Sequence, residues 1–203
     1  MNILYLTFYF EPDLSAGSFR NTTLAQSLAQ AIGKNDNIDL ITTSPNRYKT
    51  YRQTAPAFED KGNLKIHRID VYEHKNDFLG QIYSFKTFFL NVRKLTKNRK
   101  YDIVFASSSR LFTAYLGYVI ARRNNTPLYL DIRDIFVDTM EDILKNPLIK
   151  QITIPVIKII EKKTFNYARH INLISEGFAP YFQKFKCRSF SYYSNGIDDE
   201  FLL

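Results

Sequence analysis

The stretch "MNILYLTFYFEPDLSAGSFRNTTLAQSLA", residues 1–29, decides the fold of this chain. Its first part, "NILYLTFY", is a continuous apolar run of strand length, which is typical of a strand covered on both faces. A polar loop with one glycine follows. Residues 18–32 then carry apolar side chains at helical spacing, and Gly33 stands where a helix stop belongs. A buried strand followed by a glycine-containing loop and a helix predicts the first unit of a parallel α/β sheet.

The rest of the chain continues this alternation of apolar strands and amphipathic helices, apart from a long polar loop over 44–63. The order predicts a single doubly wound, Rossmann-like α/β domain over residues 1–203, with a mostly parallel sheet and helices on both faces. The further predicted strands are 37–44, 64–71, 101–108, 126–134, 170–175 and 189–198, and the further predicted helices are 78–98, 109–123, 147–168 and 176–186.

Composition narrows the class of protein. With 203 residues, of which 45% are hydrophobic, the chain can bury a full core. Its one cysteine, Cys187, cannot form an intrachain disulfide and is interpreted as a structural thiol in a reducing compartment. The start lacks the pattern of a signal peptide, and no apolar stretch reaches the roughly 20 residues that span a bilayer. We therefore expect a cytoplasmic protein.

The net charge of +8 favours contact with phosphates, whether of nucleic acid, an anionic membrane surface or a phosphorylated substrate. Charge alone does not choose among these partners.

Polar residues follow most of the predicted strands. In open parallel sheets, ligands bind beyond the carboxyl ends of the strands, so these residues are expected to meet along one rim. The candidate residues are Gly17, Ser18 and Arg20 after the first strand, Ser108 after the fourth, Asp131, Arg133 and Asp134 after the fifth, Ser175 and Glu176 after the sixth, and Asn195 after the last.

The first of these loops has the features of an anion site. Gly17 permits close approach of the backbone to a ligand, and a helix that begins near Ser18 offers unpaired amides and a positive dipole end. The alternative is that Gly17 only permits a turn and Ser18 only caps the helix. Neither the dinucleotide-binding G-x-G-x-x-G nor the phosphate loop G-x-x-x-x-G-K-[ST] is present, so the sequence does not predict a dehydrogenase or an NTPase.

The segment "DIRD", residues 131–134, is the sharpest cluster of charge. An aspartate at the end of a buried strand is costly unless it is paired, and Arg133 is the neighbour that could pair Asp131. One interpretation is structural, with Asp131 capping the next element. The other is a carboxylate held over the cleft to accept substrate hydroxyls or to manage a proton.

No metal site or cofactor is predicted. The three histidines do not form an H-x-H or H-E-x-x-H pattern, and there is no cysteine pair.

Several blocks, in order along nearly the whole chain, resemble the N-terminal domain of family-4-type glycosyltransferases of the GT-B fold, the kind that build bacterial capsule and O-antigen sugars. The opening stretch resembles their first strand, glycine turn and helix. Phe136 and Val137 depart from the tryptophan and proline usual in the block "PLYLDIRDIFVDTM", and the histidine that many relatives carry is absent. The other blocks are "YDIVFASSS", "PLYLDIRDIFVDTM", "INLISEGF" and "YYSNGID".

The resemblance implies the acceptor-binding half of a two-domain enzyme that transfers sugar from a nucleotide-sugar donor without a metal. The donor-binding half is missing, so we expect the chain to be inactive alone and to need a C-terminal domain or partner subunit. Gly17 and Ser18 would lie beside the donor phosphates with Arg20 as a charge partner, and Asp131, Arg133 and Asp134 would lie near the transfer centre. The expected acceptor is a sugar or a lipid-linked sugar.

Residues 81–100 combine an aromatic stripe with six basic residues. We interpret the aromatics as core. The basic charges are either a solvated face or an attraction to an anionic membrane, which would place the protein peripherally on the inner face of the cytoplasmic membrane. The alternative to an enzyme is a non-enzymatic basic module that binds a membrane surface, nucleic acid or a protein. Nucleic acid is disfavoured because no helix-turn-helix, RNA-binding or zinc pattern is present.

Overall fold

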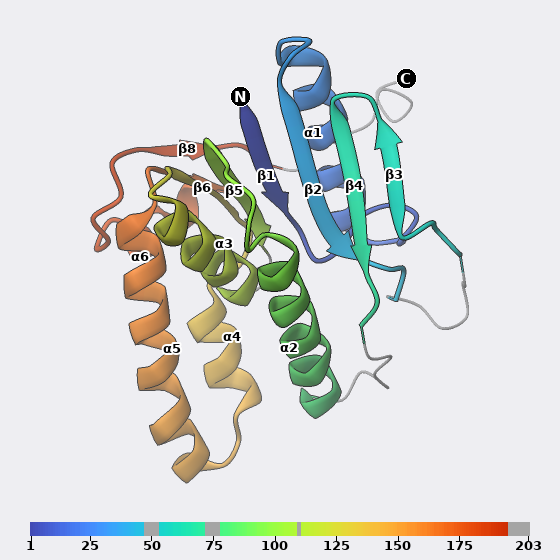
Figure 1. The fold of residues 1–203 in the computed structure, drawn as a ribbon. Helices are drawn as coiled ribbons and strands as arrows, with labels where there is room; N and C mark the ends of the chain where they lie inside the picture. The colour runs from blue at the N-terminus through green and yellow to red at the C-terminus, as the bar shows by residue number, and fades with distance from the viewer. Residues whose placement is uncertain (47–52, 72–77, 109–110, 195–203) are drawn as a thin grey trace, which may run out of the picture.

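A computed structural model describes residues 1–46, 53–71, 78–108 and 111–194 of the chain. In this part, eight strands form one sheet in the order β3-β4-β2-β1-β5-β6-β7-β8 (Figure 1). Every neighbouring pair is parallel except β3 with β4. The predicted class, one α/β domain with a mostly parallel sheet, is confirmed. The strands are β1 (Asn2–Leu6), β2 (Asn37–Thr43), β3 (Phe58–Lys61), β4 (Leu64–Ile69), β5 (Ile103–Ser108), β6 (Leu128–Ile132), β7 (His170–Leu173) and β8 (Phe190–Tyr192).

Helices cover both faces of the sheet. On one face α1 packs alone, whereas α2, α3, α4 and α5 form a thicker layer on the other face and project beyond the sheet (Figure 1). The helices are α1 (Ala16–Ala31), α2 (Phe78–Leu95), α3 (Leu111–Asn124), α4 (Phe136–Ile143), α5 (Pro147–Tyr167), the 3-10 turn η1 (Glu176–Phe178) and α6 (Ala179–Phe182).

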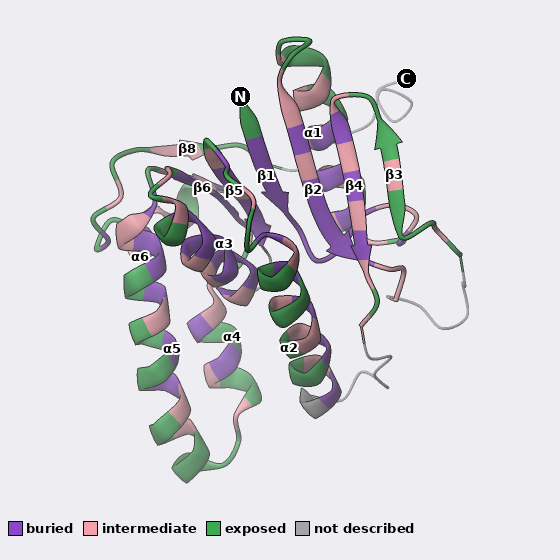
Figure 2. Cartoon of the chain, in the orientation of Figure 1, coloured by how far each residue is buried: buried purple, intermediate pink, exposed green. Residues whose placement is uncertain are grey.

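The first strand shows how the two layers arise. Successive side chains of a strand point to opposite faces, so Ile3 and Tyr5 join the core under α1, whereas Leu4 and Leu6 join the core under the thicker layer. All four are buried, as the apolar run predicted. Figure 2 shows this burial along the central strands.

Two elements were not predicted. β3 lies inside the expected loop and has one apolar residue, Phe58. It is an edge strand held by its ladder to β4 and by the ion pair between Arg68 and Glu59, so hydrophobic patterning could not reveal it. α4 is only eight residues long, so its apolar pattern extends over little more than two turns, too short to separate a helix from a loop by sequence.

Some boundaries also differ. The first strand ends at Leu6 rather than Tyr9, the last ends at Tyr192, and the predicted helix 176–186 is η1 and α6 over 176–182. The helix after the first strand is capped by Ser15, whose side chain accepts a hydrogen bond from the Ser18 amide at 3.1 Å, and not by Ser18.

The strand order creates a crevice at one place on the sheet. From β1 the chain builds outward through β2 and β4, and from β5 it builds in the opposite direction through β6, β7 and β8. The connections after β1 and β5 therefore part at the carboxyl ends of these two neighbours. A ligand crevice is expected at such a switch point. Within the described residues, no helix is both long and apolar enough to cross a membrane.

Close packing of α3 on the sheet gives a first prediction. A side chain at Gly117 would place its Cβ 3.1 Å from the Ala106 Cβ and 3.2 Å from Leu128 Cδ1. Gly117→Val should lower the free energy of unfolding by about 1–3 kcal/mol, because extra methyls there overpack the interface. Urea denaturation followed by circular dichroism measures this. Gly177→Val, the same change in an exposed turn, is the control; equal losses in both variants would contradict the packing argument.

Candidate active site

A pocket of about 710 Å³ opens at the predicted crevice. Its floor comes from the segment after β1, from the end of β5 and from the segment after β6. Its walls are α2, α3 and α4. Ser107, Ser108, Arg133 and Asp134 are among the polar residues that line it.

The walls of the pocket are aromatic. Phe85 of α2 lies 5.3 Å from Phe112 of α3 between ring centroids, and Phe112 lies 5.4 Å from Phe136 of α4 in an edge-to-face arrangement. This row of rings holds the three helices together and presents apolar surface to the pocket. The mouth is apolar as well, because Ile82, Leu90 and Ile143 line it while remaining about half exposed. Such a pocket fits a ligand with an apolar body.

Arg133 lies where the pocket meets the start of α1. A Cβ on Gly17 would fall 2.9 Å from Arg133 Nη2 and 3.1 Å from Nη1, so a side chain at position 17 would force this guanidinium to shift. Burial lowers the pKa of Arg133, and the carboxylates of Asp131 and Asp134 act in the opposite direction. Its buried Nε has no hydrogen-bond partner among the described residues.

Asp134 is the carboxylate available to a ligand. Its side chain is exposed at the pocket, and within the described part of the chain it accepts no hydrogen bond. Partial burial raises the pKa of its carboxyl group, and the charge of Arg133 opposes that rise. A carboxylate in a pocket with a raised pKa and free oxygens suits proton transfer with a substrate hydroxyl.

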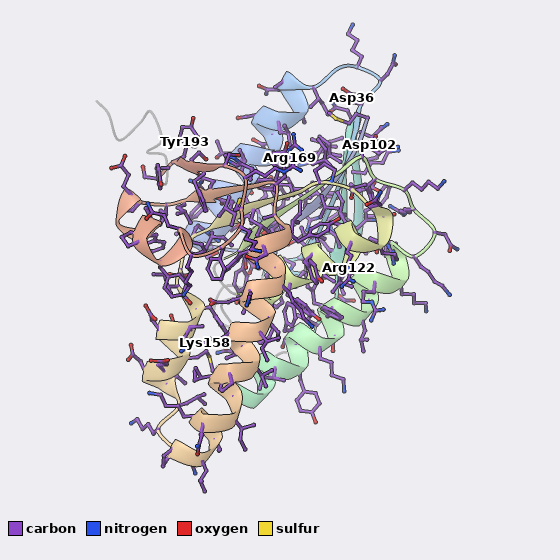
Figure 3. All side chains as sticks on the ribbon, turned by 90° about the vertical axis from the view of Figure 1, so that its left-hand side faces the viewer. Asp36, Asp102, Arg122, Lys158, Arg169 and Tyr193 are labelled. Carbon is purple, nitrogen blue, oxygen red and sulfur yellow. The ribbon has the colours of Figure 1, made fainter. Side chains whose placement is uncertain are left out.

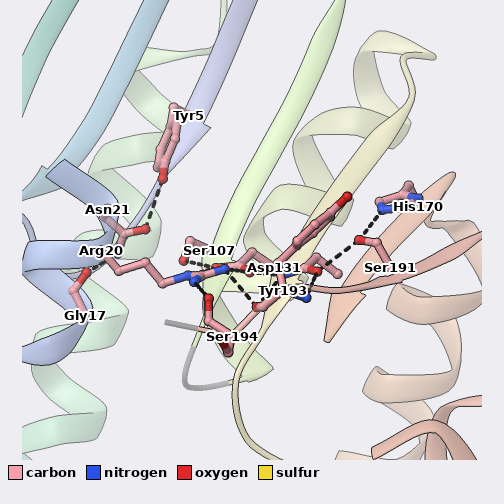
Figure 4. A network of polar contacts seen from close by, with 11 residues as sticks. Tyr5, Gly17, Arg20, Asn21, Ser107, Asp131, His170, Ser191, Tyr193 and Ser194 are labelled. Carbon is pink, nitrogen blue, oxygen red and sulfur yellow. Dashed lines mark hydrogen bonds and ion pairs between the residues drawn. The ribbon is translucent and has the colours of Figure 1, made fainter. Parts of the chain in front are cut away.

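Asp131 is in a different environment (Figure 4). It is 1% exposed, and four donor groups reach its two oxygens. Arg20 binds both oxygens, with Nε 3.1 Å from Oδ2 and Nη2 2.9 Å from Oδ1. Asn172 donates to Oδ1 at 2.7 Å and Ser107 to Oδ2 at 3.0 Å. This arrangement favours a structural role, because little hydrogen-bonding capacity remains for a substrate.

The pairing inferred from sequence needs correction. The counter-ion of Asp131 is Arg20, not Arg133. Arg20 also donates to the carbonyl of Ser194 at 2.6 Å and to that of Tyr193 at 3.4 Å. Its guanidinium therefore ties α1 to β6 and to the segment after β8. The physical reason is position: Arg20 lies in the second turn of α1, directly across from the buried carboxylate, whereas the strand ends before Arg133.

The other predicted residues are not all brought together. Ser108 lines the pocket, but Ser18 is fully buried and its side chain does not reach the surface. Ser175 and Glu176 are exposed at η1, outside the pocket lining, where Ser175 accepts a hydrogen bond from the Gly177 amide at 3.1 Å. Asn195 lies outside the described residues.

The sequence did not reveal the pocket walls. The aromatic stripe of α2 was interpreted as core. Phe88 and Val92 are indeed fully buried, but Phe85 and Phe89 are partly buried and line the pocket. One feature of the sequence could have indicated the pocket walls. The apolar stripe of α2 is wider than a helix needs in order to cover one face of a sheet. In the described residues, no three His, Cys, Asp or Glu side chains gather as a metal would require.

Solved structures of glycosyltransferases share this fold. Sucrose-phosphate synthase from Thermosynechococcus elongatus matches with a TM-score of 0.65 and 11% identity over 100% of this chain and 93% of that one, and a second structure of that enzyme matches over 47% of its length. HepE from Anabaena, in complex with UDP-glucose, matches with a TM-score of 0.55 and 14% identity over 98% of this chain and 45% of its own. The calicheamicin glycosyltransferase CalG4 matches with a TM-score of 0.54 and 12% identity over 97% of this chain and 52% of its own.

The fold is that of one half of a GT-B glycosyltransferase. Apart from the 93% match, the chain spans about half the length of these relatives. No protein-family model matches the sequence, and no curated protein sequence matches it significantly.

The Arg20–Asp131 pair gives a prediction with a pH dependence. Burial raises the pKa of Asp131, but the hydrogen bonds from Arg20, Asn172 and Ser107 outweigh it, so the folded-state pKa is lowered. Its contribution to stability is therefore present above the unfolded pKa of about 4 and is lost as the pH falls below it. Arg20→Met leaves a buried carboxylate without a counter-ion and should cost about 3 kcal/mol at pH 7.

Without Arg20, burial should raise the pKa of Asp131, so the deficit of Arg20→Met should shrink as the pH falls toward 4. Denaturant midpoints at several pH values measure this for wild type, Arg20→Met and the double variant Arg20→Met/Asp131→Asn. The double variant removes the charge and should show the smaller, pH-independent deficit. A deficit in Arg20→Met that is the same at every pH would exclude the ion pair as its cause.

Proposed function

We propose that this chain is the acceptor-binding half of a glycosyltransferase that uses a nucleotide-sugar donor. The observation that carries the proposal is the pocket at the β1–β5 switch point, with apolar walls and with Arg133 and Asp134 at its floor. The fold shared with glycosyltransferases supports it.

The chemistry assigns different roles to the two charged residues. In the transfer step, a bond forms between the acceptor hydroxyl oxygen and the anomeric carbon of the donor, the bond from that carbon to phosphate breaks, and the nucleoside diphosphate leaves. Asp134 orients the hydroxyl and takes up its proton. The guanidinium of Arg133 lies against the start of α1, in the space left by the missing side chain of Gly17. There it supplies positive charge toward the leaving diphosphate.

The finer assignment rests on the ordered sequence blocks. They support a family-4-type enzyme of cell-surface polysaccharide synthesis in the cytoplasm, with a sugar or lipid-linked sugar as acceptor. A second lobe, either a C-terminal domain or a partner subunit, would bring the donor to the open edge of the pocket. The chain by itself should not transfer sugar.

The test uses a protein in which the chain is joined to its donor-binding half. Asp134→Asn should lower the rate of sugar transfer about 10²–10⁴-fold, because the proton acceptor is lost while the shape is kept. Gly17→Val should lower it roughly 10²-fold, because the added methyls displace the Arg133 guanidinium. Release of nucleoside diphosphate with and without acceptor measures the rate.

Asp102→Asn is the control, since Asp102 (labelled in Figure 3) accepts a hydrogen bond from the Asn2 amide at the amino end of β1 and is not among the pocket-lining residues. It should leave transfer unchanged. Circular dichroism and thermal unfolding establish that each variant is folded. Normal turnover in both Asp134→Asn and Gly17→Val would refute the site, and the absence of any transfer by the folded wild-type protein over a broad panel of donors and acceptors would refute the function.

A further inference from the structure

α5 is apolar on two opposite faces. Ile154, Ile157 and Phe165 on one face are buried in the core. On the opposite face, Leu148, Ile152, Val156 and Ile159 follow one another at spacings of four, four and three residues, and Ile149 lies beside them. A helix that is apolar on both sides is normally covered on both sides.

This second face, which we call the α5 stripe (Leu148, Ile149, Ile152, Val156 and Ile159), is uncovered. Its members are the most continuous group of exposed apolar side chains in the described residues, with exposed fractions of 71%, 52%, 72%, 51% and 55% in that order. Figure 2 shows exposed positions along α5, which projects away from the sheet together with α4. At 1.5 Å per residue the stripe is about 17 Å long.

Lysines outnumber acidic residues around the α5 stripe, although two of the five, Lys150 and Lys158, contact Glu141 of α4. Residues 145–163 contain five lysines and one acidic residue, Glu161, which is 2% exposed and accepts a hydrogen bond from the Tyr181 hydroxyl. The neighbouring α4 adds Asp138, Glu141 and Asp142, of which Glu141 lies 3.6 Å from Lys158. The five lysines are Lys145, Lys150, Lys158, Lys162 and Lys163.

We propose that the α5 stripe binds the surface of an anionic membrane, with its apolar side chains among the acyl chains and its lysines at the headgroups. An exposed apolar face flanked by lysines has the composition of a helix that lies in the membrane interface. No described helix is suited to span a bilayer, so the helix lies on the membrane rather than across it. The proposal does not depend on sugar transfer.

A second copy of the chain fits the α5 stripe less well. In an antiparallel two-fold contact the same flank of each helix meets its own copy, so the row of Lys158 and Lys162 would face an identical row. Anionic headgroups, in contrast, complement that row. The basic α2 helix is a weaker apolar anchor, because among its described side chains it exposes three large apolar ones, Ile82, Tyr83 and Leu90, against five in the α5 stripe.

The test exploits the absence of tryptophan from the chain. Ile152→Trp places a single fluorophore in the α5 stripe, and Phe19→Trp places one at an exposed position of α1 on the other side of the sheet. With vesicles of phosphatidylcholine and phosphatidylglycerol that contain brominated acyl chains, the first should shift to the blue and be quenched, and the second should not. With phosphatidylcholine alone, both signals should stay close to those in buffer.

Vesicle co-sedimentation then separates the surfaces. Ile152→Asp/Val156→Asp should weaken binding to anionic vesicles at least tenfold. Lys158→Gln/Lys162→Gln should weaken it by roughly fivefold for each lysine removed. High salt should weaken wild-type binding. The matched control, Lys94→Gln/Lys97→Gln, removes two exposed lysines near the end of α2 and should have a smaller effect.

Three results would overturn the proposal. The first is equal binding to neutral and anionic vesicles, or to neither. The second is loss of binding in the α2 variant but not in the α5 variants. The third is a dimer in sedimentation that Ile152→Asp dissociates, which would assign the stripe to a second copy of the chain.

Discussion

The carboxyl-terminal edge of the sheet, where the pocket opens, is organised around one buried carboxylate, that of Asp131. Asp131 is the penultimate residue of β6 and is buried, and a buried charge is tolerated only when it is paired and hydrogen-bonded. Arg20 supplies the countercharge from α1, and the side chains of Ser107 and Asn172 complete the shell from β5 and β7. Satisfying one group thus fixes a helix against three neighbouring strands. Arg20 also donates a hydrogen bond to the backbone after β8. The Arg20–Asp131 pair is therefore linked to β5, β6, β7 and the segment after β8.

This pairing divides four charged residues into two sets. Arg20 and Asp131 neutralise each other within the fold and have little capacity left for a ligand. Arg133 and Asp134 do not pair in this way. The Arg133 guanidinium packs over Gly17, and Asp134 remains exposed, with the pKa of its carboxyl group raised. The sequence "DIRD" places three of these residues together, and only the spatial position of Arg20 shows which carboxylate is structural. The saturated ion pair gives the neighbouring pocket a rigid support, which the proposed transfer chemistry would need.

The parts of the fold that burial dictates were predictable from sequence. The strands β1, β2, β5 and β6 are apolar runs, and α1, α3 and α5 have helical spacing with clear starts or stops. The parts that depend on tertiary contact were not predictable. β3 is an edge strand with little apolar content, α4 has only eight residues, and the Arg20–Asp131 pair joins residues 111 positions apart. For the candidate site, Ser108, Arg133 and Asp134 line the pocket, but Ser18 is buried and Ser175 and Glu176 lie outside the lining. Sequence shows that a residue follows a strand, not the direction in which its side chain points.

The pocket and the α5 stripe have a common physical feature, which is apolar surface that this domain does not bury. α4 connects them: Met140 lines the pocket, Ile143 lies at its mouth, and the chain then turns into α5, where Leu148 begins the stripe. Exposed apolar surface of this extent costs free energy in water and contributes nothing to the core, so its presence on two adjoining helices favours external partners for both. A ligand with an apolar body in the pocket and a membrane along α5 are compatible occupants. α4 ends and α5 begins at the projecting end of the helical layer (Figure 1), with Ile143 of the pocket before this turn and Leu148 of the stripe after it. The polar floor, in contrast, lies at the sheet, where Asp134 and Arg133 would meet the hydroxyl end of such a ligand. The direction from apolar mouth to charged floor therefore sets the orientation in which an amphiphilic acceptor would enter.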